Sequence, residues 1–565
     1  MDTLLLEPLK YYKSAIVRHK EEATKRFDDM VNRSGVDVAK NRETVNRYNA
    51  KLKEIDKVNS KIKKFTLLFW LIIFACIGIG IAAVILFLNP PESIPLLIGL
   101  TAGGIILIAV AIILAAKKVR PIIKNAEKVK QRLEDEASTI RSEAETQMAP
   151  LNALFREADT LELIEITMPE IRFHKSYTPS HEQLLIEEYD YIDLTDDETS
   201  VTDTLSGTIF ENPFLYERYI EHRMTMATYS ASITIHWTER VRDSKGNTRT
   251  VHRSQVLTAT VTKPKPSYSV VTHLGYGCHA ASNLSFSRTE SDTDELSEGA
   301  LARRIKKGER KLQKQAEKSA KSGGSFQEMA NSEFDVLFGA HNRNHEVEFR
   351  LMYTPLAQNN TVDLLRSKDG YGDDFDFIKQ GKYNIIKTVH AQKWKMRTDV
   401  SLFRSFDIDT ARNNYISYNE EYFKSIFFDF APLLSIPSYH ENTKKADKVQ
   451  KCKSNFTQYE HEVLANAIGT HAFAHPDSAT DSILKTLFLE KSGNRDRVRV
   501  TAHSYRAEPR IEPVSVFGRD GRFHIINVPW VEYIPLTASR NILLSASAFE
   551  SSDAHLHGIS AKLCD

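Results

Sequence analysis

Two histidines have a residue type and a spacing that suit metal-dependent chemistry. His471 and His475 stand in the segment HAFAH. Residues four apart on a helix share one face, so their imidazoles could hold one metal ion. Gly469 and Pro476 flank the segment and disfavour a helix there. The chain holds 19 histidines, so the spacing also arises by chance, and surface histidines are the competing interpretation.

Asp373 and Asp374 are the second candidate pair of metal ligands. They lie with Asp369 and Asp376 in KDGYGDDFDF. Clustered carboxylates can hold Mg²⁺ or Ca²⁺, but this spacing does not match an EF-hand loop. A solvated acidic loop is the simpler interpretation. A metal at either pair would make the chain a metal-dependent hydrolase or nuclease.

The usual catalytic motifs are missing from the sequence. It contains no G-x-x-x-x-G-K-[ST], no H-E-x-x-H and no G-x-S-x-G. Its four cysteines form no C-x-x-C and are expected to be reduced thiols. We therefore expect no cofactor, and we favour a protein that is not an enzyme.

A basic segment covers residues 301–321, with nine Lys or Arg against two Glu. It is a solvated helix face, a contact with an anionic membrane surface, or a nucleic-acid contact. The net charge of +1 and the lack of interleaved aromatic residues make nucleic acid an unlikely partner. The residues expected at a membrane surface are Arg303, Arg304, Lys306, Lys307, Arg310, Lys311 and Lys314.

Two charge-free apolar segments predict a transmembrane hairpin at 65–116. Segments 65–88 and 94–116 have 24 and 23 residues, and each is long enough to cross a bilayer. The NPPES turn between them contains two prolines and can only reverse the chain. The sequence thus predicts a two-pass integral membrane protein.

The basic residues around this hairpin predict its orientation. Six Lys precede the first segment from Lys51 onward, seven Lys or Arg follow the second up to Arg132, and the NPPES turn has none. The positive-inside rule then places both termini in the cytoplasm. We expect a plasma (inner) membrane location.

The arms at 1–64 and 117–160 carry helical stripes. A seven-residue repeat predicts a coiled-coil-like stalk that continues the hairpin. We favour pairing of the two arms within one chain, and a homo-oligomer through the arms is the alternative. The expected seam residues are Val38, Val45, Tyr48, Leu52, Ile55, Asn59, Ile62, Ile122, Ala126, Val129, Leu133, Ala137, Ile140 and Ala144.

The remaining chain reads as an α+β cytoplasmic region with antiparallel hairpins. We divide it into a β-rich lobe at 161–300, a basic helix and linker at 301–325, and an α+β lobe at 326–565. Alternating residues predict a long hairpin that Pro264 and Pro266 end, and an Asp-Gly turn predicts another near 520. Alternation also predicts a half-buried strand at 347–353.

The expected function is display of this region on the stalk as a scaffold or assembly protein. The expected partner is the lipid bilayer, and the sequence does not identify a protein partner. One alternative is a membrane-tethered metal-dependent hydrolase or nuclease. Another is a lipid or envelope-stress sensor in which the basic segment binds and releases the bilayer.

Overall fold

The computed structural model describes residues 4, 6–88, 94–242, 248–368, 370–393, 396–440, 454–546 and 559–564. The predicted NPPES turn and Cys452 therefore lie outside the described residues. The chain forms two compact units. We call Lys20–Asp159 with Asp399–Asn419 the helical unit, and Met1–His19, Thr160–Thr398 and Glu420–Asp565 the sheet unit.

Helices α2 (Pro8–Ser34) and α3 (Val38–Leu88) are separated by a left-handed Gly35, with φ +67°. The two helices are separate there because glycine adopts that conformation without strain. Helix α3 continues from the polar arm into the first apolar segment. The second apolar segment forms α4 (Ile94–Leu114).

Both apolar segments form helices long and apolar enough to cross a membrane. In the most apolar window of the first helix, no residue is buried. Leu71, Phe74 and Ile106 are each more than half exposed. These helices thus present apolar side chains outward, whereas a core helix of a soluble protein would bury them.

A five-residue π-helix, Ala115–Val119, joins α4 to α5 (Arg120–Asn152). Pro121 follows in the first turn of α5. Proline lacks an N–H and its ring clashes with the carbonyl four residues earlier in a regular α-helix. The π turn is wider than an α turn because its backbone hydrogen bonds connect residues five apart, and the extra width removes the clash with the proline ring.

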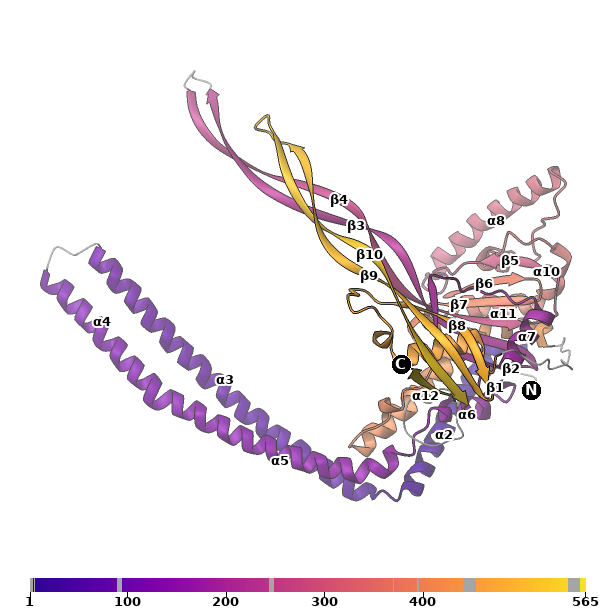
Figure 1. Cartoon of the computed structure of the whole chain (residues 1–565), viewed down its shortest axis with the longest axis horizontal. Coiled ribbons are helices and arrows are strands. Elements are labelled where there is room, and N and C mark those ends of the chain that lie inside the picture. The colour runs from indigo at the N-terminus through magenta and orange to yellow at the C-terminus, as the bar shows by residue number, and fades with distance from the viewer. Residues whose placement is uncertain are drawn as a thin grey trace. The chain divides into compact units, whose positions relative to one another are not determined.

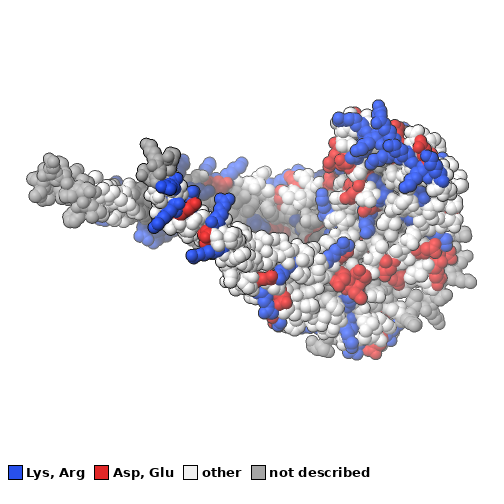
Figure 2. All heavy atoms as spheres, turned by 90° about the horizontal axis from the view of Figure 1, so that it is seen from above, with Lys and Arg blue, Asp and Glu red and all other residues white. Residues whose placement is uncertain are grey.

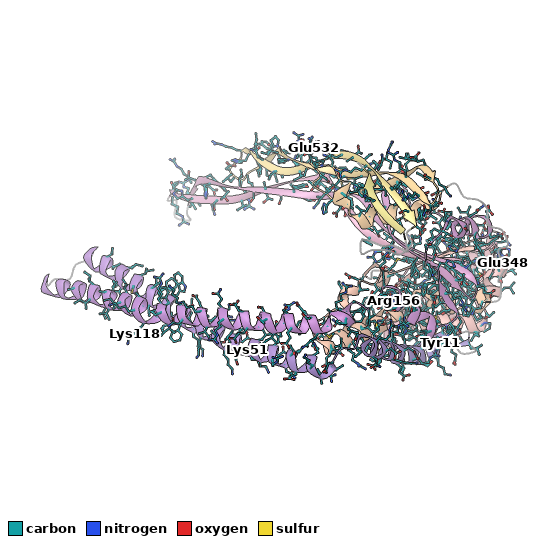
Figure 3. All side chains as sticks on the ribbon, turned by 60° about the horizontal axis from the view of Figure 1, so that its bottom comes forward. Tyr11, Lys51, Lys118, Arg156, Glu348 and Glu532 are labelled. Atoms are coloured by element: carbon teal, nitrogen blue, oxygen red, sulfur yellow. The ribbon has the colours of Figure 1, made fainter. Side chains whose placement is uncertain are left out.

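Helices α3 and α5 run antiparallel and side by side (Figure 1). Arg47 pairs with Glu143 at 3.2 Å, and Lys51, labelled in Figure 3, pairs with Glu136 at 3.0 Å. The contact buries Val45, Ile55, Ala137 and Ala144 of the expected seam. Three further expected residues, Leu52, Ile122 and Val129, are exposed.

The sheet unit contains a seven-stranded sheet in the order β1-β2-β3-β4-β7-β6-β5. Every pairing in it is antiparallel. Its strands are β1 (Ile171–Phe173), β2 (Thr199–Ile209), β3 (Asn212–Arg242), β4 (Thr248–Gly277), β5 (Ser285–Arg288), β6 (Phe375–Gln380) and β7 (Tyr383–Thr388).

This sheet changes the predicted division of the chain. Strand β5 comes from the expected lobe at 161–300, while its neighbour β6 comes from the expected lobe at 326–565. The basic helix and linker at 301–325 therefore form an excursion between two strands of one sheet. Both ranges contribute to one unit.

A four-stranded antiparallel sheet follows in the order β11-β10-β9-β8. The Asp-Gly turn joins β9 to β10, as predicted, and Gly521 has a φ of +79°. The strands are β8 (Ile483–Ser492), β9 (Arg495–Phe517), β10 (Phe523–Ala546) and β11 (Ile559–Cys564).

The two long hairpins pack on each other over their outer parts, residues 224–242, 248–266 and 507–531, which we call the β arm (Figure 1). Its core includes Ile235, Leu257, Ile526 and Val528. Lys263 lies 4.6 Å from the centre of the Trp530 ring and pairs with Glu512.

The prediction that Pro264 and Pro266 end the first hairpin is wrong. Strand β4 continues to Gly277, with Pro264 opposite Met226 and Pro266 opposite Met224. Proline is tolerated at a strand edge because its missing N–H leaves no ladder bond unmade. Apart from β3, the described strands that pair with β4 reach it only at Leu274–Gly277.

Helix α13 (Gln458–Ile468) packs on both β2 and β8, so it links the two sheets. Its residues Tyr459, Val463 and Leu464 belong to a buried cluster with Leu215 and Val500. The other helices of the region are α6 (Ala158–Thr167), α7 (Pro179–Tyr189), α8 (Glu298–Lys321), α9 (Ser332–Phe338), α11 (Pro355–Leu365) and α12 (Ile408–Leu434).

The strand predicted at 347–353 is instead a helix, α10 (Glu346–Met352). Phe349 and Met352 are buried three residues apart, while Val347 and Leu351 are exposed. The His345 side chain accepts a hydrogen bond from the Glu348 backbone N–H and caps the helix. The alternation of apolar residues in the sequence therefore did not predict which of them are buried.

Candidate functional site

Neither predicted pair of metal ligands belongs to a larger cluster of metal-ligating side chains among the described residues. No group of three or more His, Cys, Asp or Glu side chains in the described ranges could hold a metal ion. His471 lies in a three-residue 3₁₀ helix after Gly469, and His475 lies beyond it. The Nδ1 atom of His475 accepts a hydrogen bond from the Asp477 backbone N–H at 3.1 Å. These two histidines therefore do not share a helix face.

Asp373 and Asp374 each pair with a different cation. Asp373 is fully buried, binds the Arg288 guanidinium and accepts a hydrogen bond from the Ser291 hydroxyl. The Asp374 carboxylate lies 2.8 Å from Nδ1 of His390. Two adjacent carboxylates thus serve two separate ion pairs, and neither stands in a solvated acidic loop.

His390 is held between two carboxylates. Its Nε2 atom lies 3.0 Å from the Asp429 carboxylate, and the Tyr371 ring stacks on it at 3.8 Å between centroids. Burial favours the neutral imidazole, but the charges of Asp429 and Asp374 outweigh it and raise the pKa of His390 to about 10. His390 is therefore a cation at neutral pH.

The seven expected membrane-surface residues lie on α8. Leu301 and Leu312 are buried on one side of this helix, where the Val336 side chain of α9 packs against Gly308. The opposite side carries the basic residues, which Figure 2 shows as a concentration of Lys and Arg. Six of the seven are exposed, and Arg304 is half-buried and paired with Asp292.

A cavity of about 420 Å³ lies beside Arg304, which is one of its walls. Arg288 forms another wall, and Leu337 and Gly339 of the α9 end contribute the apolar side. We call this cavity the anion pocket because its lining contains two guanidinium groups and no carboxylate. Four hydroxyl side chains complete it: Ser287, Thr289, Ser291 and Thr293.

Sequence reasoning identified Arg304 but missed Arg288 and the four hydroxyl residues. The segment SFSRTESDTDE holds all of them, and its density of Ser and Thr around one Arg was the available signal. The acidic residues in the same segment obscured it. Two of those acidic residues, Asp292 and Asp294, are not part of the lining.

A second cavity of about 440 Å³ lies between β3 and the β8–β9–β10 strands. His222 lines it, its Nδ1 atom bonded to the Glu198 carboxylate and its ring 5.2 Å from those of Tyr268 and Tyr505. Its Nε2 atom has no hydrogen-bond partner within the described ranges. A carboxylate that orients an imidazole is the geometry of a general base, but among the described residues Nε2 is not hydrogen-bonded to a nucleophile.

A buried carboxylate on α13, that of Glu462, links the two sheets. Glu462 accepts a hydrogen bond from the Val201 N–H at 2.9 Å and pairs with Lys485 at 2.8 Å. Burial raises the pKa of the neighbouring Glu460 to about 8, so its carboxyl is largely protonated at neutral pH. Glu462 thus connects β2 with β8 and has a structural role.

These observations define the chain as one with two helices long and apolar enough to cross a membrane and an antiparallel α+β unit. No family model, no curated protein and no solved structure matches it.

Proposed function

We propose that the chain is a two-pass integral membrane protein that displays its sheet unit in the cytoplasm and acts as a scaffold for assembly with another protein. The observation that carries this proposal is the outward-facing apolar surface of α3 and α4. Contiguous apolar surface of this extent is rare on soluble monomers. A bilayer would cover it, and the antiparallel α3–α5 pair would form the stalk beneath.

The orientation rests on the basic residues at the ends of the apolar segments. Lys61, Lys63 and Lys64 precede the first, and Lys117, Lys118 and Arg120 follow the second. Positively charged flanks stay on the cytoplasmic side. The plasma membrane is the proposed location.

The β arm supplies a surface for assembly. On the outward face of β9–β10, Phe517 lies opposite Phe523, with ring centroids 5.0 Å apart. Phe523, Ile525 and Ile511 are 72%, 68% and 68% exposed. Exposed aromatic and aliphatic residues on a rigid ribbon are typical of protein interfaces.

Membrane insertion is tested by alkaline extraction of the full chain from membranes. The wild-type chain is expected to stay in the pellet, and its C-terminal tag is expected to be protease-resistant in intact cells. Leu71→Arg combined with Ile106→Arg should release it, because each central charge costs about 3 kcal/mol on insertion. Leu52→Arg, outside the apolar segments, is the matched control. A wild-type chain that extracts fully, or a tag digested outside intact cells, contradicts the proposal.

Assembly is tested with a photo-crosslinking residue at position 525, on the outward face. A discrete protein adduct is expected in cells, and Phe517→Asp should abolish it. The same crosslinker at position 526 faces the core and serves as the control, because Ile526 is 1% exposed. Equal crosslinking at both positions, or none at position 525, argues against the β arm as an assembly surface.

A second candidate function is sensing of the anionic bilayer through α8. The exposed basic side of this helix favours it, because each basic residue near an anionic surface contributes about 1 kcal/mol. A variant with a Gly/Ser linker in place of residues 65–116 should bind anionic vesicles at low salt and release them at high salt. Binding that does not depend on salt would reject this function. The metal-dependent hydrolase has no comparable support, since its His and Asp candidates join no group of three or more possible metal ligands among the described residues.

A further inference from the structure

The anion pocket contains more positive hydrogen-bond donors than its protein partners use. Arg288 is 3% exposed, and its Nη2 atom binds Asp373 and donates to the Thr289 carbonyl at 3.1 Å. Its Nε and Nη1 atoms are buried and have no partner in the part of the chain that the structure describes. A buried unused donor costs free energy unless a ligand or water accepts from it.

Arg304 is the group that a ligand would reach first. It is half-buried, and its Nη1 atom lies 3.5 Å from the Ser291 hydroxyl, while Nη2 is paired with Asp292. Asp292 is itself 54% exposed, so this ion pair is open to water and can be exchanged for another anion. The guanidinium thus stands at the rim of the pocket with a replaceable partner.

The chemistry of the lining selects a phosphate group. Guanidinium groups bind phosphate oxygens through paired N–H donors, and the Ser287 and Thr289 hydroxyls can donate to further oxygens, whereas the Ser291 hydroxyl already donates to Asp373. The exposed basic residues of α8 raise the positive potential outside the entrance. A cavity of about 420 Å³ is larger than a phosphate and admits the organic group attached to it.

We propose that the anion pocket binds a phosphate monoester, with Arg304 as the first contact and Arg288 and the hydroxyl side chains behind it. The monoester is either the headgroup of an anionic lipid or a soluble phosphorylated metabolite. The proposal goes beyond membrane anchoring and scaffolding and does not depend on either.

Calorimetric titration of the full chain in neutral detergent tests the proposal. The ligands are glycerol 3-phosphate, short-chain phosphatidic acid, and short-chain phosphatidylglycerol as a phosphodiester of like charge sign. Arg304→Gln should weaken monoester binding about tenfold, the usual loss for a charge-assisted hydrogen bond. Arg303→Gln is the matched control, because it removes the same charge from α8 but does not line the pocket.

A second variant keeps the test decisive if Arg304→Gln fails to fold. Asp292→Asn removes the competing carboxylate and should strengthen monoester binding severalfold, a gain that damage to the fold would not produce. Equal affinity for glycerol 3-phosphate and phosphatidic acid assigns a soluble ligand, whereas binding of phosphatidic acid alone assigns a lipid headgroup. No monoester binding, equal binding of phosphatidylglycerol, or equal losses in Arg303→Gln and Arg304→Gln would overturn the proposal. Membrane retention would be unaffected by any of these results.

Discussion

At the scale of single residues, the sheet unit is stabilised by cations enclosed with carboxylates. Arg343 shows this most simply: its buried side chain binds Asp335 at 2.7 Å and Glu346 at 2.9 Å, with the Phe349 ring 4.4 Å away. His390 repeats the arrangement with a group that can lose its proton. Its charge, unlike that of arginine, responds to pH.

We expect His390 to make the stability of the sheet unit fall with rising pH. Its pKa is raised from 6.5 to about 10 on folding, so its contribution is complete below pH 6.5 and is lost as the pH rises to about 10. The midpoint of thermal unfolding should therefore differ most between wild type and His390→Gln near pH 6.5, and least near pH 10. His471→Gln, at an exposed site, is the control. A difference that is constant across this range would contradict the assignment.

Sequence patterns predicted few of these residue-level partnerships. Asp373 and Arg288 are 85 residues apart, and Asp429 lies 39 residues beyond His390. Spacing along one segment reports local periodicity, whereas these pairs depend on how distant strands and helices come together. The anion pocket was missed in part for this reason, because Arg304, α9 and the segment 287–293 come together only in the fold.

At the scale of helices and strands, sequence periodicity predicted those elements whose apolar residues recur at a regular local spacing. The two long hairpins confirm predictions made from alternation and from the Asp-Gly turn. The length of the first hairpin was underestimated, because Pro264 and Pro266 were taken as its end although an open strand edge accommodates them. Helix α10 shows a different error: its apolar and polar residues alternate by chance, and this alternation predicted a strand where the structure has a helix.

The β arm should depend on its thin core. Ile526 is 1% exposed and packs in the cluster with Leu257 and Val528. Ile526→Ala should destabilise the arm by about 2–4 kcal/mol, because it removes buried methyl groups and leaves a cavity. Hydrogen exchange should rise in β9 and β10 of the arm. Ile525→Ala, one residue away on the exposed face, should have little effect; similar exchange in both variants would show that the two hairpins do not share a core.

At the scale of the whole molecule, the chain divides into two compact units. The sequence predicted a division of the cytoplasmic region at 301–325, where composition changes abruptly. The structure instead pairs strands across that segment. A change in composition marks an inserted surface helix as readily as it marks a boundary between domains.

A change in the helical unit should therefore remain local. Ala144 is fully buried in the α3–α5 contact, and Ala144→Leu should cost about 1–3 kcal/mol by overpacking. Hydrogen exchange should increase in α3 and α5 but not in β9 and β10. Ser142→Leu, at an exposed position of α5, is the matched control. Increased exchange in the β arm would show that the two units are energetically coupled.

The π turn at Ala115–Val119 sets the rotational phase of everything that follows it. A turn of this kind accommodates one extra residue, and each residue advances a helix by about 100°. Removing Ala116 would therefore rotate α5 about its axis, so that its small, buried side would turn away from α3 and charged side chains would face α3. Substitutions in this short segment should be tolerated far better than a change in its length.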